Sequence, residues 1–210
     1  MKLVLGFGPA RSGVFSAGNG PAMRSALIGV WFREDLERMR EFVRVSTRMT
    51  HTDPKAEYGA LAVALAAAGR LDAFAGLCPD RVFVERVCGL AFDPGNGISG
   101  YIYDTVSGAI ALASRYAGDY RGAVTAAIAC GGDTDTVAAI TGAIVGARVG
   151  EAGIPREWIE GVRDWPRGIA GLRRLAAGEV PRVSYLGSIW RNALFFVVAL
   201  AHVVGTIRWR

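Results

Sequence analysis

The stretch from Gly131 to Gly150 constrains the fold most strongly, because a glycine-led polar turn opens directly into a long helix of small residues. Small residues recur along this predicted helix at Ala138, Ala139, Gly142, Ala143, Gly146 and Ala147. Since small side chains let neighbouring helices approach closely, we expect a central helix in a tightly packed bundle. The composition agrees, with 33 alanines and 28 glycines among 210 residues and no Gly-X-Y period.

Helical periodicity dominates the rest of the chain, and no alternating pattern of convincing length predicts a strand. Apolar residues recur every three or four positions over 34–49, which indicates an amphipathic helix. Thr52 or Asp53 is expected to cap the next helix, in which Pro54 takes the first turn. Further helices are predicted over 22–32, 56–68, 80–90, 105–116, 120–130, from Asp133 to about Val149, and from 154 onward, with loops over 1–20 and 93–97. We therefore predict an all-α chain that forms a single domain over residues 1–210.

Charge and cysteine usage exclude several classes of protein. The formal charge of +5 arises in residues 160–210, which contain eight arginines and three acidic residues. These arginines, including Arg163, Arg167, Arg173, Arg174 and Arg182, are spaced along helix-like and loop segments. A nucleic-acid surface would gather them on one face with aromatic residues between, so no nucleic-acid partner is expected. The three cysteines form no C-x-x-C pair, which argues against a disulfide framework or zinc site and favours buried free thiols in a reducing cytoplasm.

The two ends of the sequence indicate neither secretion nor a membrane span. Only five apolar residues, 3–7, precede the first interruption, which is too few for a secretory signal. Residues 192–207 carry no formal charge but are fewer than the ~20 apolar residues that cross a bilayer. We therefore expect a cytoplasmic protein without a membrane partner, whose buried terminal helix holds His202 in the core.

The strongest candidate site is the motif Gly131-Gly132-Asp133-Thr134-Asp135-Thr136. Two carboxylates separated by one residue can direct their oxygens to one point, and the Thr136 hydroxyl adds a third donor that Mg²⁺ or Mn²⁺ favours. The alternative is that Asp133 or Asp135 only caps the helix. Because the motif precedes an uncharged alanine-rich helix, metal binding is favoured over capping.

A second candidate site lies at 16–24, with the sequence SAGNGPAMR. Free amides of a glycine turn at a helix N-terminus can bind a phosphate or diphosphate, and Arg24 either contributes or pairs with an acidic neighbour. An ordinary loop and cap is the alternative, and the pattern does not match the G-x-G-x-x-G of a Rossmann fold.

His51 and Tyr101 are weaker candidates from the residues alone. His51 stands in the polar break Thr50-His51-Thr52-Asp53 and could hydrogen-bond a ligand, although such a histidine is more often a loop or capping residue. Tyr101 and Tyr103 follow a glycine loop, where aromatic stacking on a base or ribose competes with ordinary core packing.

Taken together, these segments resemble the ADP-ribosylglycohydrolase superfamily. The resemblance rests on SAGNGPAMR at 16–24, THTDPKAEYGALAVALAAA at 50–68, SGYIYDTVSGAIA at 99–111, CGGDTDTVAAITGAIVGARVG at 130–150 and IPREW at 154–158. It implies an orthogonally packed helical domain with a binuclear Mg²⁺ or Mn²⁺ centre, which hydrolyses the bond between ADP-ribose and a protein side chain or small acceptor. By the same resemblance, Asp133, Asp135 and Thr136 become metal ligands. Ser16, Gly18 and Asn19 become contacts to the diphosphate and ribose, His51 a further ligand contact, and Tyr101 a residue lining the adenosine side.

One departure from the family pattern changes these expectations. Members of the superfamily begin with a G-D-x-x-G segment and a T-D-D-T motif, which supply the other metal ligands and the catalytic acids, and neither is found ahead of the matched segments in this sequence. The chain therefore resembles an N-terminally truncated member that keeps the C-terminal two-thirds of the family fold. Its set of metal ligands is incomplete, and no catalytic acid is identified. Exposed apolar surface is then expected to favour a homo-oligomer or association with a missing N-terminal piece. A non-catalytic ADP-ribose or nucleotide-binding module is the alternative to an active hydrolase.

Overall fold

The computed structural model describes residues 12–90, 92–93, 95, 97–162, 168–179 and 184–207, except for the side chains of 203, 204, 206 and 207. Helices make up nearly all of the regular structure in these residues, and the only β-pairing among them is in isolated bridges. The chain divides into two compact units, Met1–Pro155 and Arg156–Arg210. The all-α prediction is confirmed, whereas the single domain over 1–210 stays a prediction.

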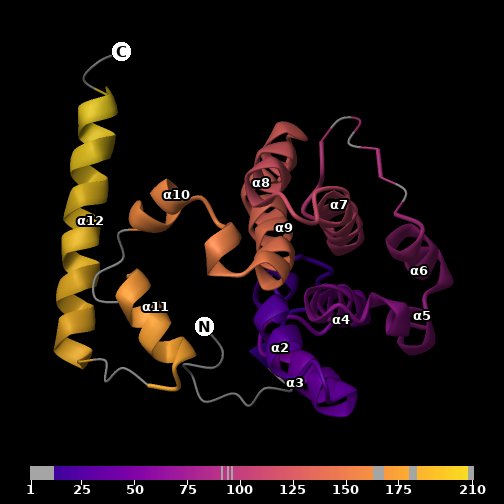
Figure 1. The fold of residues 1–210 in the computed structure, drawn as a ribbon. Helices are drawn as coiled ribbons and strands as arrows, with labels where there is room; N and C mark the ends of the chain where they lie inside the picture. Colours follow the sequence, from indigo (N-terminus) through magenta and orange to yellow (C-terminus); the bar gives the residue numbers. More distant parts are fainter. Residues whose placement is uncertain are drawn as a thin grey trace. The chain divides into compact units, whose positions relative to one another are not determined.

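The first unit contains eleven helices or 3₁₀ turns in the part of the chain that the structure describes. These are η2 (Ala22–Arg24), α2 (Ser25–Trp31), α3 (Leu36–Arg48), α4 (Pro54–Ala68), η3 (Leu71–Ala73), α5 (Phe74–Leu77), α6 (Arg81–Cys88), α7 (Ile102–Arg115) and α8 (Tyr120–Ala129), followed by α9 (Thr134–Val149) and η4 (Glu151–Gly153). Helix α4 contacts α2, α3, α7 and α9, and α9 also packs along α7 and α8 (Figure 1).

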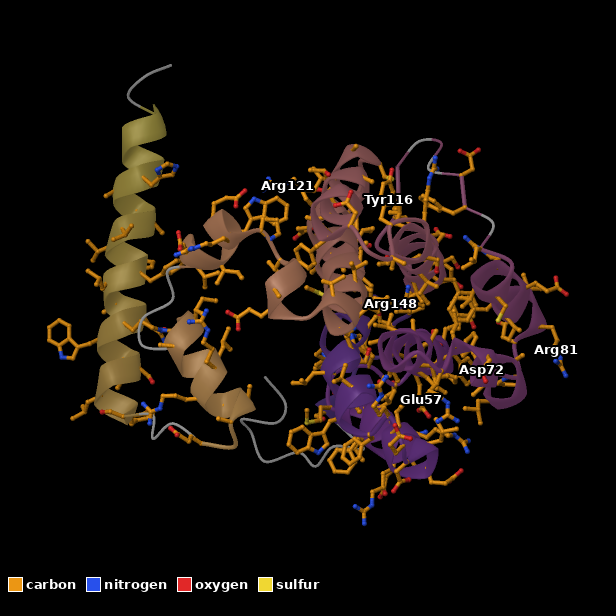
Figure 2. The ribbon with its side chains drawn as sticks, in the orientation of Figure 1. Glu57, Asp72, Arg81, Tyr116, Arg121 and Arg148 are labelled. Atoms are coloured by element: carbon orange, nitrogen blue, oxygen red, sulfur yellow. The ribbon has the colours of Figure 1, made fainter. Side chains whose placement is uncertain are left out.

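The centre of this unit is α4, because its alanine-rich sequence can be buried on every side. Asp53 caps the helix by accepting a hydrogen bond from the Lys55 amide, and Gly69 ends it in the left-handed conformation at φ 72°. From Gly59 to Ala68 every residue is buried. Side chains fill the space between α4 and its neighbours (Figure 2), and Phe74, Phe83 and Met39 are among the largest that are fully buried. The buried apolar residues all lie between Ala22 and Val145 in the described chain.

Most predicted helices are confirmed with small shifts at their ends. The predicted helix 22–32 begins as the 3₁₀ turn η2 before α2, and the helix predicted from Thr105 begins three residues earlier, at Ile102. The earlier start has a local cause, because the Ile102 amide donates to the carbonyl of Ala17 across the loop at 2.9 Å. Capping by Asp53 decides between the two caps that the sequence allowed.

The second unit contains α10 (Arg156–Glu160), α11 (Ile169–Ala176) and α12 (Tyr185–Ile207). The prediction of a buried terminal helix is wrong: Trp190 and Phe195 are 75% and 73% exposed, and His202 is exposed as well. Two short helices offer too little apolar surface to surround a helix of 23 residues. None of the helices in the described part of the chain has the length and apolar character needed to cross a bilayer.

The predictions about the cysteines and about the C-terminal arginines can also be compared with the structure. All three cysteines are free, but only Cys78 is buried; Cys130 is half-buried, and Cys88 is exposed because it is the last residue of α6. Arg173 and Arg174 lie in the last turn of α11. Arg163, Arg167 and Arg182 lie outside the described residues, as does part of the predicted loop 93–97.

Candidate functional site

The start of α9 is shaped by two glycines that no other residue could replace without strain. Gly131 and Gly132 have φ angles of 74° and 78°, in the left-handed region that favours glycine. Added at Gly132, a Cβ would lie 2.2 Å from the carbonyl oxygen of Ile98. This close approach is held by two backbone hydrogen bonds, from Ile98 N to Gly131 O at 3.1 Å and from Asp133 N to Ile98 O at 2.8 Å. The turn therefore fixes the position of Asp133.

Asp133 stands at the N-cap position of α9, yet its side chain makes no capping hydrogen bond. Asp135 lies within the first turn and is exposed, and Thr136 is buried. Metal binding and capping by these aspartates both stay predictions, and one oxygen of Asp133 already has a partner in the Asn19 amide.

Asn19 joins the loop at 16–24 to the start of α9. Its side-chain amide donates to Asp133 Oδ2 at 2.6 Å and to Thr105 Oγ1 at 3.0 Å. Thr105 is fully buried in α7, and its own hydroxyl donates to the Ser99 carbonyl at 2.8 Å. The two strongest motifs of the sequence thus meet through one amide group, although Asn19 and Asp133 are 114 residues apart along the chain.

The loop before α7 lies close against this contact. Added at Gly100, a Cβ would lie 3.3 Å from Asp133 Oδ2 and 3.9 Å from Asn19 Nδ2. Gly18 and Tyr101 form an antiparallel bridge, so that the glycine turn at 18–20 and the loop at 98–101 run beside each other. Because residue 100 has no side chain, Asp133 Oδ2 has no side chain above it at this position.

His51 lies against the glycine turn. A Cβ at Gly18 would lie 3.1 Å from His51 Nε2, and one at Gly20 would lie 3.3 Å from His51 Cε1. The other ring nitrogen, Nδ1, is 2.9 Å from Thr50 Oγ1. Burial lowers the pKa of His51 below its usual value, and the positive charge of Arg24 lowers it further. The imidazole is therefore neutral at pH 7, with Nε2 directed at the turn.

Arg24 supports the loop rather than reaching an acidic neighbour. Its guanidinium donates to the carbonyl oxygens of Gly20 and Ser46 at 3.0 and 2.7 Å, and to the hydroxyl oxygens of Ser46 and Thr50 at 3.0 and 2.7 Å. The prediction that Arg24 either binds a ligand or pairs with an acid is thus replaced by a third role. Arg24 ties the glycine turn to the end of α3.

Ser16 and Tyr101 flank the same turn. Ser16 is half-buried, and its hydroxyl oxygen would lie 3.5 Å from a Cβ at Gly18. The Tyr101 ring is tilted against the Tyr103 ring, with centroids 5.5 Å apart, and Lys55 Nζ lies 5.7 Å from its centroid. Tyr103 in turn donates to Asp80 Oδ2 at 2.8 Å and stacks on Phe83. Tyr101 therefore joins an aromatic cluster at the edge of the site.

The electrostatics of the site centre on Asp133. Partial burial raises the pKa of this carboxyl, but hydrogen bonds from the Asn19 amide and the Thr136 hydroxyl oppose it and leave the pKa below its usual value. Asp133 is thus ionised at neutral pH. Within the described residues, no group of three or more His, Cys, Asp or Glu side chains comes close enough together to hold a metal ion.

The donor set fits one hard cation better than a pair. Two carboxylates and a hydroxyl are oxygen ligands of the kind that Mg²⁺ prefers, and Mg²⁺ commonly completes its shell with water and substrate oxygens. A second ion would need carboxylates that the described residues do not bring to this place.

The sequence did not single out two residues of this arrangement. Thr105 and Gly100 were not predicted as site residues, although both stand in the segment 99–111 that carries part of the resemblance. The signal was the run Ser99-Gly100-Tyr101, in which a glycine before the aromatic residue allows close approach of other groups.

Comparisons with known proteins bear on this arrangement. A family model described as ADP-ribosylglycohydrolase matches residues 1–184. An uncharacterized protein of Archaeoglobus fulgidus is 35% identical over 186 residues, which cover 78% of this chain and 59% of that protein. ADP-ribosylarginine hydrolase Tri1 of Pseudomonas putida is 33% identical over 91 residues, 43% of this chain and 24% of that protein. Both relatives are thus considerably longer than the part that this chain matches.

A solved structure adds a comparison of the fold. A chain of the structure titled "ADP-ribosylglycohydrolase-related protein complex" superposes with a TM-score of 0.62 at 23% sequence identity, covering 77% of this chain and 65% of that one. At this identity the likeness concerns the fold alone. The fold over 77% of this chain is therefore shared with a known structure.

Proposed function

We propose that this chain, which belongs to the ADP-ribosylglycohydrolase family, is a hydrolase that releases ADP-ribose from a modified protein side chain or a small acceptor. The observation that carries the proposal is the 2.6 Å hydrogen bond between Asn19 and Asp133. It brings a glycine turn suited to phosphate groups next to a pair of carboxylates suited to a cation. An ADP-ribose ligand offers both a diphosphate and ribose hydroxyls to such a pair of sites.

Asp133, Asp135 and Thr136 would hold one Mg²⁺ or Mn²⁺ ion. When bound, the ion would supply positive charge that orients ribose hydroxyls and lowers the pKa of water. Asn19 fixes the rotamer of Asp133 by donating to Oδ2, and Thr105 fixes Asn19 in turn. Orientation of this kind matters because small misplacements of a carboxylate weaken both binding and catalysis.

The glycine turn and its flanking side chains would bind the rest of the ligand. Ser16 and the backbone at Gly18 would contact the diphosphate, His51 Nε2 would accept or donate one hydrogen bond, and the Tyr101 ring would line the adenosine side. Neutral His51 can serve as a hydrogen-bond acceptor at pH 7. No catalytic acid is assigned among the described residues.

A non-catalytic ADP-ribose-binding module is the second candidate. The observation that favours it is the shortage of converging carboxylates in the described part of the chain. Such a module would keep the glycine turn and His51 and bind its ligand without turnover.

One experiment separates the two functions. The chain is incubated with peptides ADP-ribosylated on arginine or on serine, in Mg²⁺, in Mn²⁺ or in a chelator, and free ADP-ribose is quantified by mass spectrometry. Calorimetry with ADP-ribose is run under the same three conditions. Metal-dependent release supports the hydrolase, whereas metal-independent binding without release supports the module. Absence of both release and binding would overturn the proposal.

A further inference from the structure

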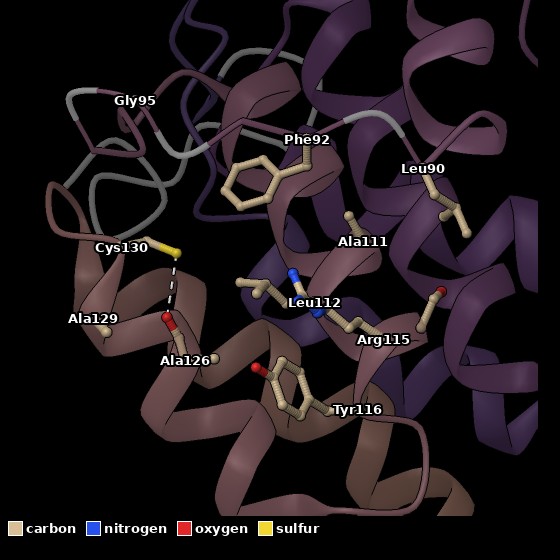
Figure 3. A pocket seen from close by; sticks show the side chains of 11 residues that line it. Leu90, Phe92, Gly95, Ala111, Leu112, Arg115, Tyr116, Ala126, Ala129 and Cys130 are labelled. Atoms are coloured by element: carbon tan, nitrogen blue, oxygen red, sulfur yellow. Dashed lines mark hydrogen bonds between the residues drawn. The ribbon is translucent and has the colours of Figure 1, made fainter.

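An open pocket of about 690 Å³ lies between α7 and α8, with Leu90, Phe92 and Gly95 along one side (Figure 3). Its walls are mainly apolar, with Leu90, Phe92, Ala111, Leu112, Tyr116 and Ala126 among them. The volume falls in the range of sites for small organic ligands, which is roughly 300–1,000 Å³. None of the residues assigned to the candidate functional site lines this cavity.

Small residues create the space. Ala111 on α7 and Ala126 and Ala129 on α8 face the cavity, where larger side chains would fill it. Two aromatic rings, those of Phe92 and Tyr116, stand on opposite sides of the hollow in Figure 3. Alanines that leave a gap between aromatic walls suit a flat apolar body.

Arg115, which is exposed, places a positive charge at the rim of this mainly apolar pocket. Its guanidinium lies 5.9 Å from the centroid of the Tyr116 ring. Among the described residues, the Arg115 guanidinium has no side-chain hydrogen bond and no ion pair. A guanidinium offers five donors in a planar fork that matches a carboxylate. With one cation and no neighbouring lysine or arginine in the lining, the site matches a single negative charge better than a phosphate dianion.

The backbone at the cavity's edge is held in an unfavourable conformation. Leu90 has a φ of 51°, and no other non-glycine residue in the described ranges has a positive φ. This conformation costs a residue such as leucine about 1–2 kcal/mol. It lets the chain turn after α6 while Leu90 contributes to the cavity wall. Strained residues of this kind concentrate at functional sites.

We propose that this cavity binds an aromatic monocarboxylate. The flat ring system would lie between Phe92 and Tyr116, and the carboxylate would accept hydrogen bonds from the Arg115 guanidinium. The site is separate from Asp133 and Asn19 and does not depend on the hydrolase function proposed above.

The test uses naphthalene-2-carboxylate and its uncharged counterpart naphthalene-2-carboxamide as probes of the full-length chain. Calorimetry is expected to show saturable binding of the carboxylate about tenfold tighter than that of the carboxamide. Arg115→Gln should remove this tenfold preference while the carboxamide still binds. The control Arg81→Gln carries the same loss of charge on α6, where Arg81 points outward (Figure 2), and should keep the preference.

Location is tested independently through Cys130, which lines the cavity and is half-buried. In a Cys88→Ser background, the carboxylate should slow alkylation of Cys130 by N-ethylmaleimide at least fivefold. Ala111→Trp should abolish binding of both probes, and Ala126→Leu is a second filling variant should the first one lose its helical circular dichroism. Equal affinity for the two probes, an unchanged preference in Arg115→Gln, or unprotected Cys130 would each overturn the proposal.

Discussion

A single amide nitrogen decides the geometry of the candidate site. Asn19 Nδ2 donates to both Asp133 and Thr105, so the loop, α7 and α9 depend on one side chain. Spacing along the sequence predicted Asn19 and Asp133 as site residues, because both stand in glycine-led turns. It could not predict that Asn19 contacts Asp133 and Thr105 directly. These hydrogen bonds join residues 114 and 86 positions apart, and such contacts depend on tertiary packing.

Replacing Asn19 tests the strength of this contact. Asn19→Ala removes the charge-assisted hydrogen bond to Asp133 and the one to Thr105, and should lower the free energy of unfolding by about 1–2 kcal/mol. Asn19→Asp keeps the size but places a carboxylate against Asp133, and should lower it by a further ~1 kcal/mol at pH 7. Urea unfolding followed by circular dichroism measures both variants. Equal stabilities of the two variants would contradict the assigned contact.

Asp135 carries the clearest functional prediction. Because Asp135 is exposed in the first turn of α9, Asp135→Ala should abolish metal-dependent release of ADP-ribose and leave helical circular dichroism nearly unchanged. The release assay with Mg²⁺ and Mn²⁺ measures the first effect. Asp72→Ala, in the 3₁₀ turn η3, is the matched control and should keep its activity. A large loss of helix in Asp135→Ala would instead assign the residue a structural role.

His51 makes stability depend on pH in a defined direction. Burial and Arg24 lower its pKa in the folded chain below the unfolded value of 6.5, so the unfolded chain binds more protons in acid. The contribution of His51 is fully present above pH 6.5 and is lost as the pH falls below that value. His51→Gln should flatten the decline in the urea midpoint between pH 7 and pH 5. An identical decline in the variant would show that other groups cause it.

At the scale of the elements, close helix packing explains why the sequence predicted so much of the fold. The small residues of α4 and α9 indicate helices that others approach closely, and both lie at the centre of the first unit. Helix ends were predicted less well, because the start of α7 depends on a hydrogen bond to Ala17 in a distant loop. Local sequence patterns identify a helix, but the residue at which the helix begins also depends on its tertiary contacts.

Two glycines allow this packing to be tested with a matched pair. A Cβ at Gly29 of α2 would lie 1.9 Å from the carbonyl oxygen of Ala64, so Gly29→Ala should force α2 from α4 and cost about 2–3 kcal/mol or more. At Gly76 of α5 a Cβ would meet nothing within 4 Å. Gly76→Ala should therefore be neutral or stabilise by up to ~1 kcal/mol. Thermal unfolding compares the two variants, and similar midpoints would refute the assigned α2–α4 contact.

At the scale of the whole molecule, the sequence predicted the family and the all-α class correctly, and it failed on the terminal segment. Motifs spread from residue 16 to residue 158 identify the family, since each carries its own local signal. For α12 the apolar composition suggested burial. An apolar composition shows that burial of a segment would be favourable, but it does not show which other residues pack against that segment. The large side chains of α12 are exposed.

The division at Pro155 leads to a prediction about truncation. All buried apolar residues of the described chain lie between Ala22 and Val145, within the unit Met1–Pro155. A chain ending at Pro155 should therefore unfold cooperatively, with a thermal midpoint within about 5 °C of the full chain. Circular dichroism and calorimetry measure this midpoint. Loss of cooperative unfolding would mean that the core requires residues 156–210.

The bond between Asn19 and Asp133 spans 114 residues of chain. Its two partners can meet only after the intervening helices have assembled. We therefore expect the candidate site to be absent from a partly folded chain. For any destabilising substitution in the core, the proposed activity and the helical structure should therefore be lost together, at the same denaturant concentration.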